Sequence, residues 1–238
     1  MRVFFALIFI LFSIINWSCT KVECPPQANA SLVKDSSHTV DTTHTKTIVV
    51  IDTITLQGTQ IIHSEVHSIT LTTNYATSGR LAVWSITNGN VPDTAHSYLK
   101  FDYSSIPTGA TIISATLTLY ADTAQVEVGQ KGYCVLSGPN NWLIAKLNTA
   151  WAANTITWKN APVADTTNAI QAPGSGNSPF KTYTIDLTSI VQYEFSNPSS
   201  NYGVELRLAN ESKWRGLAFY SPDGPAGLQP TLLITYKK

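Results

Sequence analysis

The chain has 238 residues, which is enough for one large β-rich domain and a targeting segment. Its 15 basic and 15 acidic residues give a net charge of zero, so the sequence offers no electrostatic footprint for nucleic acid. Charged residues make up only 13% of the chain and Met occurs once, a balance that favours an extracytoplasmic β protein over a helical cytoplasmic enzyme.

The first residues predict a lipoprotein signal peptide over residues 1–18. Met1-Arg2 forms a short positive end, and the apolar run over residues 3–15 is too short to span a bilayer. The run ends at Ser18-Cys19, which resembles the cleavage site of Bacteroidetes-like lipoproteins. We expect Cys19 to become the lipid-modified first residue and to anchor the chain at the bacterial outer membrane or cell surface. The alternative is a plain secretory signal with an incidental cysteine.

Residues 19–46 predict a lipid-anchored polar linker, because large apolar side chains are almost absent from them. We interpret its histidines, His38 and His44, as solvated. Two further cysteines, Cys24 and Cys134, allow either a disulfide or a buried, free Cys134. No CxxC motif or Cys/His cluster occurs in the sequence, so no metal and no other cofactor is predicted.

Residues 47–238 predict one all-β domain, a jelly-roll-like β-sandwich with one short helix. The clearest signal is the run 98–120, in which a Pro/Gly turn separates two alternating strands. The second of these strands places Ile113, Ala115, Leu117 and Leu119 on one face. Further strands are expected over residues 48–56, 61–71, 81–86, 125–137, 180–187, 202–208, 214–220 and 232–236.

Three other segments have a predicted form. Residues 88–93 contain Asn, Gly, Pro and Asp and predict a long turn. Residues 151–162 predict a compact turn-strand-turn unit. Residues 188–195 predict a helix of about two turns with Thr188 as its N-cap.

Four segments follow one another in a fixed order: YLKFDYSSIPTGATIISATLTLY, WAANTITWKNAP, YTIDLTSIVQYEFSNPSSNYGVELRL and FYSPDGPAGLQPTLLITYK. Together they resemble a DNRLRE-type domain, also classed as carbohydrate-binding module family 96. The resemblance covers residues 53–238 and is weaker before residue 80. It implies a β-sandwich that attaches a protein to extracellular polysaccharide, and some relatives are linked to alginate.

The motif residues are expected to be structural. Asp102 and Asp186 stand at strand ends, where a carboxylate accepts hydrogen bonds from turn amides. The side chains expected to face inward are Phe101, Ile106, Leu117, Leu119, Trp158 and Ile185.

The sequence predicts that the protein is not an enzyme. Glycoside hydrolysis needs two carboxylates about 5 to 10 Å apart. The glutamates, however, lie in separate segments: Glu65, Glu127, Glu194, Glu205 and Glu211. We interpret His63, His67 and His96 as isolated. The first two, four residues apart on a strand, are about 13 Å apart and cannot share a metal.

Sugar binding needs planar aromatic side chains with hydrogen-bonding groups beside them, and Trp84, Trp142 and Trp214 are the candidates. Trp214 is the strongest because it lies in the polar loop 211–216. There Lys213 and Arg215 could pair with a uronate carboxylate. The opposing interpretation is that the Trp214 ring packs into the end of the sandwich and has a structural role.

The sequence therefore predicts a non-catalytic, membrane-anchored lipoprotein that binds extracellular polysaccharide, acidic alginate-like chains included. Its partners would be that polysaccharide and, through the lipid on Cys19, a membrane. The alternative is a structural or adhesion module that contacts protein or matrix partners without binding sugar.

Overall fold

A computed structural model of the chain describes residues 49–124, 132–177 and 182–238. The predicted signal peptide (1–18), Cys19, the linker 19–46, Cys24 and Glu127 lie outside the described residues. Residues Thr47–Lys238 form one compact unit. Within the described part, no helix has the length and apolarity needed to cross a membrane.

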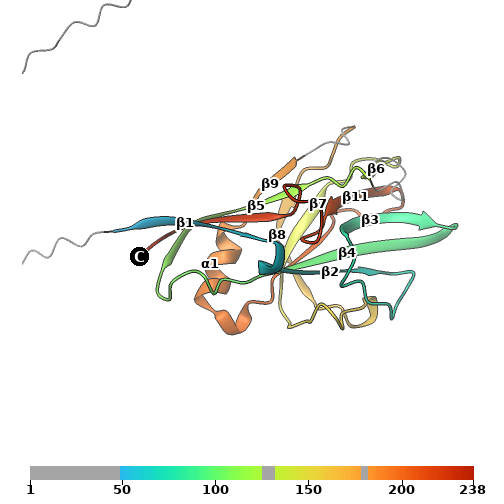
Figure 1. The fold of residues 1–238 in the computed structure, drawn as a ribbon. Coiled ribbons are helices and arrows are strands. Elements are labelled where there is room, and N and C mark those ends of the chain that lie inside the picture. Colours follow the sequence, from blue (N-terminus) through green and yellow to red (C-terminus); the bar gives the residue numbers. More distant parts are fainter. Residues whose placement is uncertain (1–48, 125–131, 178–181) are drawn as a thin grey trace, which may run out of the picture. The chain divides into compact units, whose positions relative to one another are not determined.

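The unit is an all-β sandwich of two antiparallel sheets with a single α-helix in the described part (Figure 1). One sheet has the strand order β1 (Ile51–Gln57), β12 (Thr231–Lys237), β5 (Thr111–Tyr120) and β9 (Thr182–Asp186). The larger sheet has the order β6 (Tyr133–Val135), β11 (Arg215–Tyr220), β3 (Arg80–Asn88), β4 (Val91–Phe101), β10 (Val204–Leu208), β7 (Trp142–Leu147) and β8 (Ala164–Ala172). β2 (Ile61–His67) also pairs with β4.

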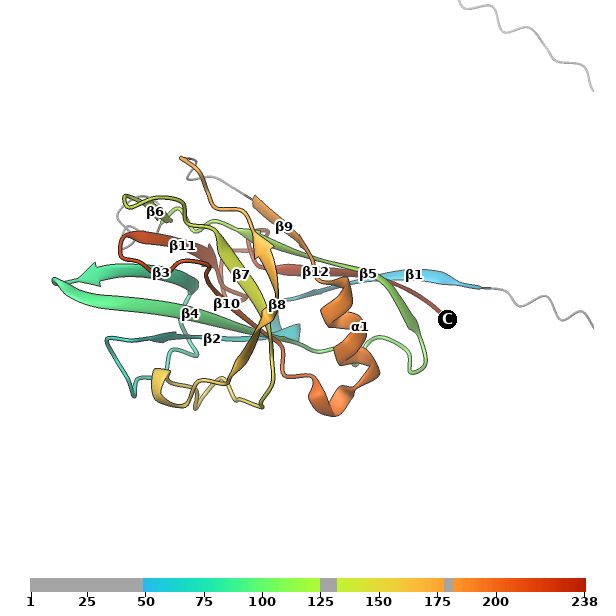
Figure 2. The ribbon, with the colours of Figure 1, turned by 180° about the vertical axis from the view of Figure 1, so that it is seen from behind.

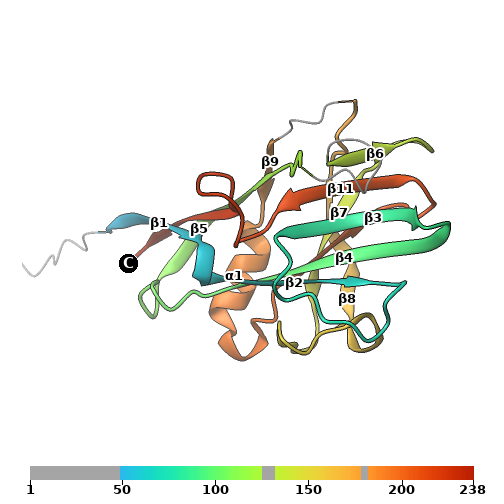
Figure 3. The same cartoon turned by 45° about the vertical axis from the view of Figure 1, so that its right-hand side comes forward.

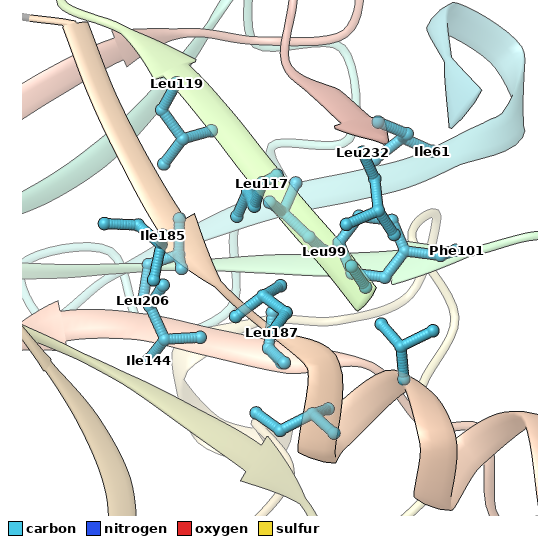
Figure 4. Close-up of a cluster of buried hydrophobic side chains, with 14 of the residues drawn as sticks. Ile61, Leu99, Phe101, Leu117, Leu119, Ile144, Ile185, Leu187, Leu206 and Leu232 are labelled. Atoms are coloured by element: carbon cyan, nitrogen blue, oxygen red, sulfur yellow. The ribbon is translucent and has the colours of Figure 1, made fainter. Parts of the chain in front are cut away.

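The main core lies between the two sheets and takes side chains from both (Figure 4). Leu117 of β5 and Ile185 of β9 belong to the same buried cluster as Ile144 of β7 and Leu206 of β10. Two smaller clusters flank the main core. One contains Trp84 with Ala82, Ile86, Ala95, Cys134 and Ala218, and the other contains Val66, Tyr98, Leu147 and Ile156.

Most of the predicted inward-facing side chains are buried, with two exceptions. Ile113 is exposed, because the register between β12 and β5 shifts by one residue near it and turns its side chain outward. Trp158 is only partly buried, at the edge of the cluster around Tyr98. The turn roles of the two aspartates are confirmed: Asp102 Oδ1 accepts the Ser104 amide at 2.9 Å, and Asp186 Oδ1 accepts the Thr188 amide at 2.8 Å.

Several elements differ from the prediction. β2 ends at His67, and residues 151–162 contain a 3-10 turn at Trp158–Asn160 in place of a strand. Of the predicted strand 125–137, residues 132–137 are described and contain the short strand β6, and β7 and β8 had not been predicted. Cys134 is free and buried, as one of the two interpretations held.

The helix α1 (Thr188–Ser196) was predicted at nearly its observed bounds, but Thr188 is not its N-cap. The Thr188 hydroxyl instead accepts the Ala115 amide at 2.9 Å, and Gln192 donates to the Ile112 carbonyl at 3.0 Å. These bonds fix α1 against β5 (Figure 2).

The segment predicted as a long turn is a tight hairpin between β3 and β4. Asn88 pairs with Val91, so only Gly89 and Asn90 form the loop. Their φ angles of 55° and 69° suit a two-residue hairpin turn with both central residues in the left-handed region. Pro92 and Asp93 therefore belong to β4, and Asp93 contacts His67 of β2 at the site described next.

Candidate functional site

A cleft of about 320 Å³ lies beside the β3–β4 hairpin. β2, β3 and β4, which supply most of its walls, lie close together in Figure 3. The lining side chains that matter for its chemistry are His67, Thr70, Tyr75, Arg80, Asn88 and Asp93, with Trp84 as the buried floor.

His67 is held between two carboxylates. Its Nδ1 lies 2.9 Å from Asp93 Oδ2, and its Nε2 lies 3.3 Å from Glu65 Oε1. Burial alone would lower the pKa of His67, but the bonds to Asp93 and Glu65 outweigh that effect and raise the pKa to about 9. The ring is therefore an imidazolium at neutral pH and cannot accept a proton there.

The two carboxylates are buried, and both oxygens of Glu65 but only Oδ2 of Asp93 accept hydrogen bonds. Glu65 Oε1 accepts from the Ser78 hydroxyl at 2.8 Å and from Arg80 Nε at 3.3 Å. Glu65 Oε2 accepts the Ala82 amide at 3.0 Å. The Trp84 indole donates to Asp93 Oδ2 at 3.1 Å. The wall of the cleft thus combines two cations with two anions, and its net charge is close to zero.

Aromatic rings pack around this network. The Tyr75 ring centroid lies 4.6 Å from that of His67, and the Tyr75 hydroxyl bonds the Thr70 hydroxyl at 2.8 Å. The Arg80 guanidinium lies 4.9 Å from the Trp84 ring centroid. Trp84 itself is only 1% exposed, so it supports the cleft from below and is no open stacking platform. The polar side chains that line the cleft can form hydrogen bonds with a ligand rich in hydroxyls.

Trp214 lies at the rim of the cleft, directly before β11. The regular pairing of β11 with β3 ends at Arg215, which pairs with Ser85, and the Trp214 amide donates to the Ser85 carbonyl at 2.6 Å. The Trp214 indole nitrogen is 3.4 Å from the Thr87 hydroxyl. Ile86 and Thr87 both line the cleft. Of the tryptophans predicted as sugar contacts, Trp214 is thus exposed next to the cleft, whereas Trp84 is buried beneath the cleft and cannot stack on a sugar.

The remaining predicted site residues are placed differently. Lys213 is exposed next to Trp214. The Arg215 guanidinium donates to the Ser137 carbonyl and, at 3.3 Å, to the Ser212 carbonyl, so it holds the loop together. Trp142 is 0% exposed and donates its indole N–H to the Pro173 carbonyl at 3.2 Å. A ring buried in this way cannot stack on a sugar.

The interpretation of the histidines as isolated was wrong. His96 also bridges two carboxylates, with Nδ1 2.8 Å from Glu205 and Nε2 2.7 Å from Glu211. His63 lies 3.1 Å from Asp223. Spacing along the chain could not reveal the pairs of His63, of His96 and of His67 with Asp93, because those acids come from distant segments. Glu65, two residues before His67 on the same face of β2, could have been found from the period of a strand. No cluster of three or more potential metal ligands occurs among the residues that the structure covers.

A second cleft, of about 350 Å³, lies between the Asp102–Gly109 turn and the end of α1. Its buried acid, Glu194, accepts the Tyr103 hydroxyl at 2.9 Å and the Gly203 amide at 2.8 Å. Burial raises the pKa of Glu194. Both oxygens have an internal donor, so Glu194 ties α1 to the larger sheet and serves the fold.

Comparison with protein families gives one match. The model of carbohydrate-binding module family 96 matches residues 59–236. The matched region includes the larger sheet, β5, β9 and nearly all of β12 from the smaller sheet, every lining residue of the cleft and Trp214, and it begins just after β1. A comparison with curated proteins found no match.

Proposed function

Because the chain belongs to carbohydrate-binding module family 96, we propose that it binds extracellular polysaccharide in the cleft beside the β3–β4 hairpin. The observation that supports this proposal is the cleft itself. Hydroxyl, amide and guanidinium groups from Thr70, Asn88 and Arg80 converge there beside Tyr75, with the exposed Trp214 at the rim. Concave sites with a few fixed polar groups among aromatic side chains are typical of small-ligand recognition.

We propose that binding occurs without catalysis. The histidine of the cleft has Nδ1 hydrogen-bonded to Asp93, Nε2 within 3.3 Å of the Glu65 carboxylate and a raised pKa, so it is a poor general base at neutral pH. Asp93 has a pKa below its ordinary range, since its bonds to His67 and Trp84 outweigh the effect of burial. It is therefore a poor general acid.

A glycan array probed with the purified chain tests the proposed function. We expect selective retention of one class of polysaccharide. Failure to retain any glycan, together with specific binding to a matrix protein, would favour the adhesion module instead.

Recognition of an acidic glycan is a finer proposal, which rests on Lys213. The positive and negative charges of the cleft balance one another, and the Arg215 guanidinium donates to backbone carbonyls. This leaves Lys213 as the exposed cation next to Trp214. If Lys213 pairs with a uronate, added salt should weaken binding of an acidic glycan and leave binding of a neutral one unchanged.

We also propose that acylated Cys19 anchors the domain to a bacterial membrane. The motif Ser18-Cys19 after a short apolar run supports this proposal. In the native cell, Cys19→Ala should move the protein from the membrane fraction to the soluble fraction and remove the mass of the acyl chains. A Cys19→Ala protein that stays in the membrane fraction with unchanged mass would refute the anchor.

A further inference from the structure

The backbone of Trp214 has a conformation that core packing does not explain. Its φ angle is 64°, in the left-handed region that bulky L-residues rarely adopt. The Trp214 side chain is 47% exposed, so this backbone conformation does not serve to bury the ring. Glycine would take the same backbone conformation without strain. Strain of this kind persists where surrounding structure enforces it, and it is concentrated at functional sites.

Contacts on both sides of the residue hold this conformation. The Trp214 amide donates to the Ser85 carbonyl at 2.6 Å. The Trp214 carbonyl accepts the Ser137 amide at 3.3 Å and lies 3.1 Å from Cys134 Sγ. The indole nitrogen lies 3.4 Å from the Thr87 hydroxyl. Backbone and ring are thus both fixed before any ligand arrives, which lowers the entropy cost of binding.

The ring is also fixed at a particular place. The indole nitrogen adjoins the hydroxyl of Thr87, a residue of the cleft wall, yet Trp214 is not itself among the residues that line the cleft. A ligand confined to the cleft would leave this exposed aromatic face uncovered. A ligand that continues over the rim would cover it.

We infer that Trp214 forms a second subsite and that the ligand is a linear oligosaccharide. One sugar unit occupies the cleft, and a neighbouring unit stacks on the indole ring. This inference rests on the proposed function and adds the size of the ligand to it. A rigid aromatic face buries the apolar face of a sugar ring with little loss of side-chain freedom.

The test compares Trp214→Ala with Trp214→Gly. Both variants remove the ring, but only glycine relieves the backbone. Trp214→Gly should therefore melt about 2 to 4 °C above Trp214→Ala, the reverse of the usual order within a sheet. Both variants should lose affinity for a long ligand by about tenfold or more. Because the more stable variant binds no better, unfolding could not account for the loss.

Ligand length provides the second readout. The probes are di- and hexasaccharides of alginate, cellulose, xylan and laminarin. For the glycan that binds, the hexasaccharide should bind wild type more tightly than the disaccharide does, and this difference should vanish in both Trp214 variants. Tyr75→Ala, which alters the cleft, should weaken binding of both lengths.

The outcomes separate the two claims. Hexasaccharide affinity retained in folded Trp214→Ala and Trp214→Gly would overturn the second subsite while leaving the cleft intact. Loss of affinity only in proportion to unfolded protein would overturn it as well. If no probe binds wild type, the proposed function fails, and this inference fails with it.

Discussion

His67 and His96 share one arrangement, an imidazole between two carboxylates. His96 could not donate to both of its carboxylates as a neutral ring, because a neutral ring has only one N–H. His67 donates from Nδ1 to Asp93, while its Nε2 lies 3.3 Å from Glu65. For His96, burial lowers the pKa, but bonds to Glu205 and Glu211 outweigh it and raise the pKa. Arg207 joins that cluster at 2.7 Å from Glu211 and so balances its charge. These buried groups hold strands together and leave the cleft preformed.

The His67 cluster makes stability depend on pH. The pKa of His67 is about 9 in the folded protein and about 6.5 in an unfolded chain. The ion pairs with Glu65 and Asp93 therefore stabilise the fold fully below the unfolded-state pKa. That contribution is lost as the pH rises through about 9.

His67→Gln should consequently lower the melting temperature at neutral and mildly acidic pH. The difference from wild type should shrink as the pH rises through about 9, because the wild-type ring then loses its charge. Thermal melts of both proteins across this range provide the measurement. A difference that stays constant with pH would show that His67 acts through packing alone.

At the scale of single elements, the β3–β4 hairpin has the greatest influence on the candidate site. It carries Trp84, Asn88 and Asp93 on either side of a two-residue loop. An added Cβ at Gly89 would meet no atom within 4 Å, so any cost of Gly89→Ala comes from its φ of 55°.

Gly89→Ala should lower the free energy of unfolding by about 1 kcal/mol. Gly79→Ala is the matched control, because Gly79 also has free space around an added Cβ but no positive φ. Chemical denaturation of both variants should show a loss at Gly89 and no loss at Gly79. Equal losses in the two variants would argue against the tight hairpin.

The sequence predicted the elements with regular alternation and missed those without it. β5, β9, β12 and α1 were predicted near their observed bounds because their apolar residues recur at the period of a strand or helix. β8 has the sequence ADTTNAIQA, whose Asp, Asn and Ala residues have low strand propensity, so pairing with β7 decides its structure. Pro92 indicated a turn, but it lies within β4 next to a two-residue loop.

For the molecule as a whole, the two sheets enclose one core and leave the hairpin at one end. β1 and the C-terminus lie at the opposite end in the three ribbon views (Figures 1 to 3). The cleft is therefore remote from the strand at which the chain enters the sandwich. This placement leaves the cleft and Trp214 open to a ligand approaching the hairpin end.

The candidate site could be predicted only in part. Trp214 stood out because an aromatic residue in a polar loop is unlikely to be core, and the structure places it beside the cleft. The charged wall was missed because His67 meets Asp93 across 26 positions, and the separate His96 cluster was missed because His96 meets Glu211 across 115. Trp142 was wrongly predicted to contact sugar, because the turn residues before it did not indicate that a buried strand begins at Trp142.

The central claim is that the cleft beside the hairpin binds polysaccharide. Its most direct test is calorimetric titration of the glycan retained on the array into wild type, Tyr75→Ala and Tyr193→Ala. Tyr193 is a matched control because it is 44% exposed on α1 and outside the cleft.

We predict that Tyr75→Ala loses affinity by about tenfold or more while Tyr193→Ala binds as wild type does, with all three proteins folded at the temperature of the titration. Wild-type affinity in folded Tyr75→Ala, or an equal loss in Tyr193→Ala, would contradict the claim.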